Sequence, residues 1–283
     1  LRRQVAKEFD EDAKKFGDAR RTLIEPAERA SVETKVLDEP VTVIVSEKGF
    51  VRARSGHGHD ASQFMFKPGD ALYGAFECRT VDHLVALGSN GRVYTVPVAQ
   101  LPSARGDGAP VTSMIELEAG TRLVAYVAGA AGQPLLVATS NGYGFACTLG
   151  DMLSRVKGGK QFITVDEGAV PLRPQLVDAA RDDRIACVSE KGRLLVFAAS
   201  EIKAQPGGGR GVTLMGLDEG ESMLAAIPCN DAGIEVDGSY RNKPTRLAVT
   251  GAELEAHRGH RARKGTLIKS GFRPSAARKA AAA

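Results

Sequence analysis

Leu84–Val96 reads LVALGSNGRVYTV, two apolar runs separated by a short turn that ends in glycine. Such a pattern predicts a β-hairpin, because glycine adopts the positive φ that tight turns need. Three other stretches repeat it: VTVIVSEKGFVRAR at 41–54, LLVATSNGYGFACT at 135–148 and IACVSEKGRLLVF at 185–197. The turn glycines are Gly49, Gly91, Gly142 and Gly192, so the spacings are 42, 51 and 50 residues. This period predicts a propeller-like array of four-stranded blades.

A fifth, weaker copy is expected to begin at Leu247, with the sequence LAVTGAELEAHRGHRARKGTLI. Residues 39–271 are therefore interpreted as one all-β domain of about five four-stranded blades. Short helical turns are expected between its strands, at Val98–Leu101, Leu149–Leu153 and Ala199–Ile202. Residues 272–283 are Ala-rich, basic and without a pattern, and we expect them to be disordered.

The first 25 residues differ from everything after them. Apolar residues recur at steps of three or four from Leu1 to Phe16, which predicts one face of a short N-terminal helix. We interpret residues 1–25 as a helical segment leaving a domain outside this chain, and residues 26–38 as a linker. The charged N-terminus lacks the apolar core of a signal peptide, and no run approaches 18 apolar residues. A cytoplasmic location is expected.

Neither a metal site nor a catalytic site is evident in the sequence. The four cysteines form no CxxC pair, and Cys147 and Cys187 fall in strands, where reduced buried thiols are expected. His57 and His59 could share one face of an extended segment, but a third ligand is missing, so we interpret them as loop residues. GxSxG and HExxH motifs are absent, and we expect that this chain alone is not an enzyme.

The charge of the chain is concentrated at one end. The net charge is +4, yet residues 241–283 carry 11 Lys and Arg against 2 Asp and Glu. The remaining 240 residues carry 27 against 32. A basic terminal sector favours a polyanionic partner. The alternative is that these charges only keep the tail soluble.

A glycine-rich loop, basic in most units, follows each hairpin, about 15 to 17 residues after the turn glycine in the second, third and fourth units. The third loop, RVKGGK at 155–160, combines exposed backbone N–H groups with cations, which suits phosphate oxygens. It is not a nucleotide-binding P-loop, because GxxxxGK[ST] is absent. Aromatic residues are scarce near the loops, so contacts to the backbone of duplex DNA are favoured over base stacking. The candidate DNA-binding residues are Arg105, Arg155, Lys157, Lys160, Arg210, Arg258, Arg261, Arg263 and Lys264.

Several of these runs resemble a known family. KKFGDARRTLI at 14–24 resembles the exit from the coiled-coil gate in the A subunits of bacterial type IIA topoisomerases. EPVTVIVSEKGFVR, LPSARGDGAPVT, SNGYGFACTLGDM, RVKGGKQFITV and RKGTLIKSG resemble the C-terminal domain of the DNA topoisomerase IV A subunits. The resemblance covers nearly the whole chain except the tail. It implies a β-pinwheel, a propeller-like disc whose blades exchange strands, with a non-catalytic DNA-binding role beside a separate breakage-reunion domain.

The resemblance also implies partners and a biological setting. The domain would bind and bend duplex DNA, present the transport segment, and set topology preference in relaxation, decatenation and chromosome segregation. In the full enzyme the partners would be the B subunit of topoisomerase IV and a second A subunit, whereas the isolated segment is expected to be a monomer. The full enzyme would need ATP and Mg²⁺, and this segment no cofactor. The implied location is the nucleoid-associated cytoplasm, or the periphery of the inner membrane.

The gyrase A subunit is the close relative to distinguish. Its C-terminal domain carries a Gln-Arg-Arg-Gly-Gly-Lys-Gly box in the first blade, whereas residues 54–60 here read RSGHGHD. Five repeats are visible, against six in gyrase, so topoisomerase IV is favoured. Two alternatives stay open: gyrase-type DNA wrapping, and a protein-interaction propeller that uses the acidic surface of residues 1–240.

Overall fold

The computed structural model describes residues 2–18 and 36–280, and it divides into two compact units, 1–35 and 36–283. The first unit contains the helix α1 (Arg2–Phe16), whose side chains are all exposed. The Gly17 N–H closes it on the Ala13 carbonyl at 3.0 Å. The predicted N-terminal helix is thus confirmed as far as Phe16, while residues 19–25 and most of the predicted linker lie outside the described residues.

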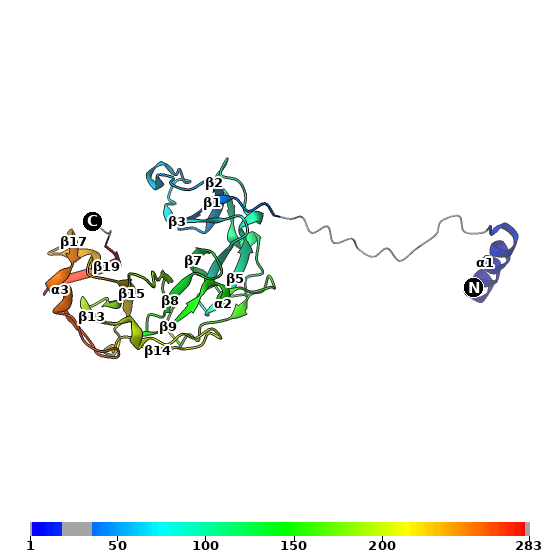
Figure 1. The fold of residues 1–283 in the computed structure, drawn as a ribbon. Helices are drawn as coiled ribbons and strands as arrows, with labels where there is room; N and C mark the ends of the chain where they lie inside the picture. The colour runs from blue at the N-terminus through cyan, green and yellow to red at the C-terminus, as the bar shows by residue number, and fades with distance from the viewer. Residues whose placement is uncertain (1, 19–35, 281–283) are drawn as a thin grey trace. The chain divides into compact units, whose positions relative to one another are not determined.

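Five antiparallel sheets, the blades, make up the second unit, and they follow one another in chain order from β1 to β19 (Figure 1). In each blade the first strand pairs with the second and the third. The first strands are β1 (Pro40–Ser46), β4 (His83–Gly88), β8 (Pro134–Ala138), β12 (Arg184–Ser189) and β16 (Ile234–Tyr240). The second strands are β2 (Phe50–Ser55), β5 (Arg92–Pro97), β9 (Tyr143–Thr148), β13 (Arg193–Ala198) and β17 (Lys243–Val249). The third strands are β3 (Leu72–Arg79), β7 (Leu123–Gly129), β11 (Gln175–Leu176), β15 (Met223–Cys229) and β19 (Phe272–Lys279).

Each of the first four blades receives a fourth strand from the blade that follows it in the chain. For example, β6 comes after β5 of the second blade but pairs with β2 of the first. Neighbouring blades therefore exchange strands, and the segment that leads back to the preceding blade is called here the exchanged loop. The exchanged strands are β6 (Ala109–Pro110), β10 (Lys160–Gln161), β14 (Val212–Thr213) and β18 (Thr266–Leu267).

A glycine with positive φ precedes every exchanged strand, where the incoming backbone meets the second strand of the blade. At Gly108, for instance, φ is +85° and a Cβ would meet the Val51 carbonyl oxygen. Only glycine avoids both the strained φ and this collision. The equivalent positions, with the carbonyl that a Cβ would meet, are Gly159 (Val93), Gly211 (Gly144) and Gly265 (Leu194).

The hydrophobic core consists of four clusters in series. In β4, Leu84 and Ala86 pack in one cluster with β1, whereas Val85 and Leu87 pack in the next with β8. Each such strand is buried on both faces, because its two sides serve two adjoining blades. This explains why the hairpins read as nearly continuous apolar runs without polar alternation.

Short helical turns connect the strands, and three of them lie where the sequence predicts them: η2 (Val98–Gln100), α2 (Leu149–Met152) and η4 (Ala199–Glu201). A capping box starts α2, in which Thr148 and Asp151 satisfy each other's backbone N–H groups. The remaining ones are η1 (Ala61–Gln63), η3 (Val111–Ser113) and α3 (Gly251–Glu255).

The fifth blade differs from its prediction in start and in strand number. It begins at Ile234, and Leu247 lies in its second strand. Arg241 and Asn242, with φ of 50° and 61°, form the hairpin turn without glycine, so the repeat is not visible there. Its sheet order is β17-β16-β19, three strands, because no following unit in the described chain supplies a fourth.

The prediction of a disordered tail over residues 272–283 is wrong for residues 272–279. These residues form β19, which pairs with β16 along its length, and Phe272 is buried. Arg278 ties the strand down through Glu235 at 2.8 Å and Asp237 at 2.5 Å. The β domain therefore continues beyond residue 271 to Lys279. Sequence periodicity could not show this, because the partners lie about 40 residues upstream.

The four cysteines are free and buried, as expected for Cys147 and Cys187. Burial raises the pKa of the Cys78, Cys147 and Cys229 thiols to about 12 each, and it raises the pKa of Cys187 as well. The folded state therefore favours neutral thiols.

Alkaline pH is expected to lower the free energy of unfolding. Unfolded thiols ionise near pH 9 and native ones near 12, so this stabilisation is complete below pH 9 and is lost as the pH rises toward 12. At pH 10 the loss is about 1.4 kcal/mol per thiol. Urea unfolding at pH 8 and pH 10 measures it, and Cys147→Ala should reduce the difference. Equal stability at both pH values would contradict the prediction.

Replacement of an exchange glycine is expected to destabilise the domain. Gly108→Ala forces a positive φ and a contact with the Val51 carbonyl, which should cost about 1–3 kcal/mol. Gly106→Ala is the matched control, two residues earlier in the same loop, where an added Cβ meets no atom within 4 Å. Thermal unfolding of both variants measures the difference. A control as damaging as Gly108→Ala would show that the strain argument is wrong.

Candidate nucleic-acid interface

Arginines that follow the hairpin turns hold the exchanged loops in place. Arg92 donates from Nε and Nη2 to the Gly158 carbonyl at 3.3 and 3.1 Å, and from Nη2 to the Gly159 carbonyl at 3.1 Å. In the first blade Arg52 donates from Nη1 to the Gly106 carbonyl at 2.8 Å. These repeated basic residues therefore fix the loop backbones, which leaves the loop side chains to make outside contacts.

The third and fourth blades hold their exchanged loops through ion pairs instead. Arg210 lies 4.3 Å from the centre of the Tyr143 ring and binds Asp166 at 2.6 Å. In the fourth blade Asp218 accepts from both Arg193, at 2.7 Å, and Lys264. The bond from Lys264 and the bond from Arg193 lower the pKa of the Asp218 carboxyl. Two of the predicted DNA-binding cations, Arg210 and Lys264, are thus engaged within the domain.

Three more of the predicted residues also have partners in the protein. Lys160 Nζ donates to the Asp151 carbonyl at 2.6 Å. Arg258 pairs with Glu255 at 3.1 Å. Arg261 donates from Nη1 to the Thr213 carbonyl at 3.4 Å. A cation with such a partner must give it up or share it before it can neutralise a phosphate.

Arg105, Arg155, Lys157 and Arg263 are the predicted residues that stay available. All four are exposed, and their side chains make no ion pair, hydrogen bond or ring contact with other described residues. Each lies on an exchanged loop, so the structure places these charges where adjacent blades meet.

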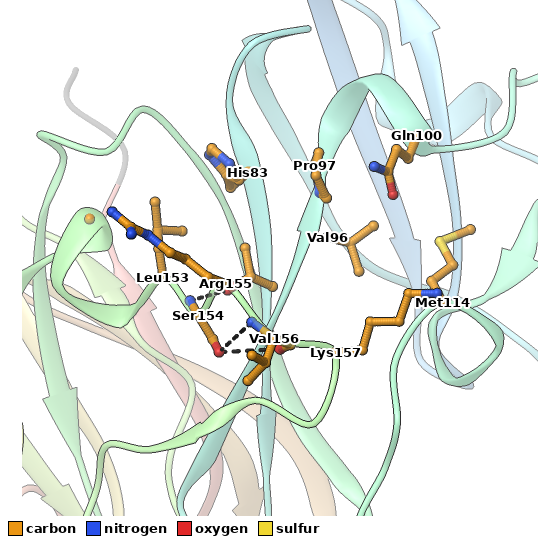
Figure 2. Close-up of a pocket in the computed structure, with 12 residues that line it drawn as sticks. His83, Val96, Pro97, Gln100, Met114, Leu153, Ser154, Arg155, Val156 and Lys157 are labelled. Carbon is orange, nitrogen blue, oxygen red and sulfur yellow. Dashed lines mark hydrogen bonds between the residues drawn. The ribbon is translucent and has the colours of Figure 1, made fainter. Parts of the chain in front are cut away.

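Arg155 and Lys157 line a cavity of about 700 Å³ in the second blade. Figure 2 shows that one wall comes from β4, β5 and η2, with His83, Pro97 and Gln100, and that the exchanged loop forms the other. No carboxylate is among its lining residues, which also include Thr95, Val96, Met114, Gly150, Leu153, Ser154 and Val156. The cavity therefore presents two cations and several neutral donors.

The backbone of this loop is fixed on both sides of its two cations. Ser154 N–H donates to Thr95 Oγ1 at 2.8 Å, and Glu116 N–H donates to the Lys157 carbonyl at 3.0 Å. The side chains of Arg155 and Lys157 extend from it in different directions (Figure 2). Because the two side chains diverge, they are better placed to contact two separate phosphates than to bind the same one.

An equivalent cavity of about 390 Å³ lies in the first blade, between β2 and the exchanged loop that contains Arg105. Arg52 and Arg54 line it from the strand, and Asp107 lines it from the loop. Arg54 is exposed and was not among the predicted residues. Only the strand exchange, which brings residues 104–107 beside β2, shows that Arg54 and Arg105 share a surface.

The histidines of the first blade are not arranged as metal ligands. The Nε2 atoms of His57 and His59 lie 2.8 Å from the Cys78 carbonyl and 2.9 Å from the Ser55 carbonyl. The described residues contain no group of three or more His, Cys, Asp or Glu side chains suited to a metal ion. Within the same residues, none of the helices is long and apolar enough to cross a membrane.

Comparison with known proteins gives matches along the chain. The family described as DNA gyrase C-terminal domain, beta-propeller, matches residues 82–120 and 183–230. The A subunit of DNA topoisomerase 4 from Neisseria gonorrhoeae is 40% identical over 272 residues, covering 93% of this chain and 35% of that protein. The protein of the same name from Escherichia coli K12 is 32% identical over 276 residues, covering 94% and 36%. The chain thus spans about a third of the length of these relatives.

Solved structures agree with these matches. The E. coli ParC C-terminal domain superposes with a TM-score of 0.72 at 28% identity, covering 84% of this chain and 98% of that one. The DNA gyrase A C-terminal domain has a TM-score of 0.56 at 18% identity over 81% of this chain and 76% of that one, which shows a shared fold.

The five blades and the exchanged strands define a propeller-like C-terminal domain of the type found in the A subunits of type IIA topoisomerases. Within that class the chain belongs to the family of topoisomerase IV A subunits, as their C-terminal domain.

Removal of the loop-holding arginine is expected to destabilise the second blade. Arg92→Ala leaves the Gly158 and Gly159 carbonyls without their donor, which should cost about 1–3 kcal/mol. Arg122→Ala is the matched control, because Arg122 is exposed on the same blade and the charge change is equal. Urea unfolding compares the two. Equal stability of the two variants would contradict a holding role for Arg92.

Proposed function

We propose that this domain binds duplex DNA through its phosphate backbone, with Arg155 and Lys157 as central contacts. The observation that supports this most directly is the cavity of the second blade, where two unpaired cations stand on a fixed loop. Arginine and lysine side chains are good donors to phosphate oxygens. Because the loop backbone is already fixed, binding needs to order only the side chains. No Phe, Tyr or Trp lines the cavity, so the proposed contact is to phosphates and does not read the bases.

The proposed contact is uneven along the domain. The exchanged loops of the first, second and fourth blades supply Arg105, Arg155, Lys157 and Arg263. In the third blade Arg210 is bound to Asp166, and Lys203 is the one cation of the exchanged loop without an ion pair among the described residues, whereas the second blade has two. We infer that the duplex binds more tightly to the blades whose exchanged loops carry more free cations. The bend of the DNA would then depend on the path that joins these blades.

In a whole topoisomerase IV we infer a non-catalytic role for this segment. It would hold a DNA segment beside a separate cleavage domain, present it for transport, and so influence which DNA topology is processed in relaxation and decatenation. The B subunit and a second A subunit would be its partners there, and the nucleoid-associated cytoplasm its location. Family membership supports this role, and the whole enzyme's activity is carried to this chain only as a proposal.

A wrapping function of the gyrase type is less favoured by the first blade. Within residues 54–60 the sequence has one arginine and no lysine, and both histidine rings lie against backbone carbonyls. A segment with one cation neutralises few phosphates. We therefore infer local bending of DNA instead of tight wrapping.

Loss of the two central cations is expected to weaken DNA binding in a salt-dependent way. Arg155→Gln with Lys157→Gln should lower affinity several-fold and reduce the slope of log K against log salt by about 1.8, since each phosphate contact contributes about 0.9. Fluorescence anisotropy with two duplexes of unrelated sequence, at several salt concentrations, measures both quantities. The loss should be the same for both sequences.

Arg181→Gln with Arg246→Gln is the matched control. It removes the same charge from cations that are paired with Asp178 and Asp237, and we expect it to keep most of the slope. If the unmodified domain gave no mobility shift with plasmid DNA, the proposed function would be wrong, and a protein-interaction propeller would be the better interpretation.

A further inference from the structure

One four-residue turn recurs in all five blades, ahead of the third strand, with glycine in its third position. Its first carbonyl accepts from the N–H three residues later, and the glycine has positive φ. The five copies are Lys67–Asp70 (KPGD), Glu118–Thr121 (EAGT), Asp166–Ala169 (DEGA), Asp218–Glu221 (DEGE) and Lys269–Phe272 (KSGF).

In the first four blades this turn carries a carboxylate that faces the hairpin turn of the same blade. In the second unit Glu118 accepts from Asn90 Nδ2 at 2.8 Å, and in the third Asp166 accepts from Asn141 Nδ2 at 2.6 Å. The corresponding contacts of the first and fourth units are Asp70 with the Lys48 N–H at 3.0 Å and Glu221 with Lys191 at 4.0 Å.

The fifth unit reverses the charge at this place. Its turn, KSGF, contains no carboxylate, and Lys269 Nζ lies 4.2 Å from the centre of the Tyr240 ring. The Arg241 guanidinium lies 5.2 Å from the same ring. Lys243 and Arg273 flank it in β17 and β19. All four cations are exposed, and within the described residues none of their side chains has an ion-pair partner.

A hollow of about 290 Å³ lies among these groups. Arg241, Arg273 and the hydroxyl-bearing Ser239 and Ser270 line it, without a carboxylate. Guanidinium groups and hydroxyls are donors to phosphate oxygens. The face of Tyr240 offsets part of the repulsion between Lys269 and Arg241, and a bound anion would offset the rest.

We propose that this tip of the fifth blade is a second phosphate-binding site, which contacts the backbone of duplex DNA independently of the second-blade cavity. The inference rests on the proposed DNA-binding function and extends it from the exchanged loops to the tip of a hairpin. The other four turns direct their carboxylate to a neighbouring hairpin or cation, whereas the fifth leaves its cations free for an external anion.

The test is anisotropy of a fluorescent duplex with Arg241→Gln plus Arg273→Gln, compared with the unmodified domain across salt concentrations. We expect a several-fold loss of affinity and a slope lower by about 1.8, with no dependence on DNA sequence. The pair Arg181→Gln and Arg246→Gln again controls for net charge, because both arginines are ion-paired. Combination with Arg155→Gln and Lys157→Gln should add the two losses, as expected for distant sites.

Circular dichroism checks that the variants fold, and Lys243→Gln with Lys269→Gln provides a second variant that leaves both arginines in place. Unchanged affinity and slope in both variants, while the unmodified domain binds DNA, would overturn this inference and leave the proposed function standing. Absence of binding by the unmodified domain would overturn both. Lower affinity with an unchanged salt slope would also overturn it, because phosphate neutralisation would not be the cause.

Discussion

The backbone pairing of each exchanged strand with the preceding blade is the constraint on which the rest of the domain depends. It requires a glycine at one position in each of four units, since the incoming backbone passes within contact of a strand carbonyl. The same pairing sets the path of the exchanged loop, and Arg92 or its equivalents then hold that loop against the blade. Side chains between the exchanged strand and the loop-holding arginine contact are free to face outward. The same repeat that builds the fold therefore also presents side chains to a ligand.

Charge in this domain has two separate uses. Asp166 and Asp218 each bind a cation next to an exchanged strand, so part of the basic character of the loops stabilises the fold. The cations that remain free are on stretches with fewer acidic neighbours, such as Arg155 and Lys157. Counting basic residues in a loop therefore overstates its capacity to bind phosphate.

Much of the fold could be predicted from the sequence, because the turn glycines and apolar hairpins are local signals. The start of the fifth blade could not, since Arg241 and Asn242 adopt positive φ without glycine. The strand at 272–279 could not either, as its partners are distant in the chain. For the candidate site, the loops are visible in the sequence, but five of nine cations have protein partners that depend on the folded arrangement, as for Lys264 and Asp218. Arg54 was missed for the same reason.

The fifth blade leaves one edge of β17 without a strand partner in the described chain. An open edge offers unpaired N–H and carbonyl groups to any extended segment, including the same edge of another molecule. Here the edge carries Pro244, which cannot donate a hydrogen bond, and the exposed Lys243, which has no ion-pair partner in the described chain and repels its own copy. These two residues therefore protect the open edge of the fifth blade against edge-to-edge aggregation.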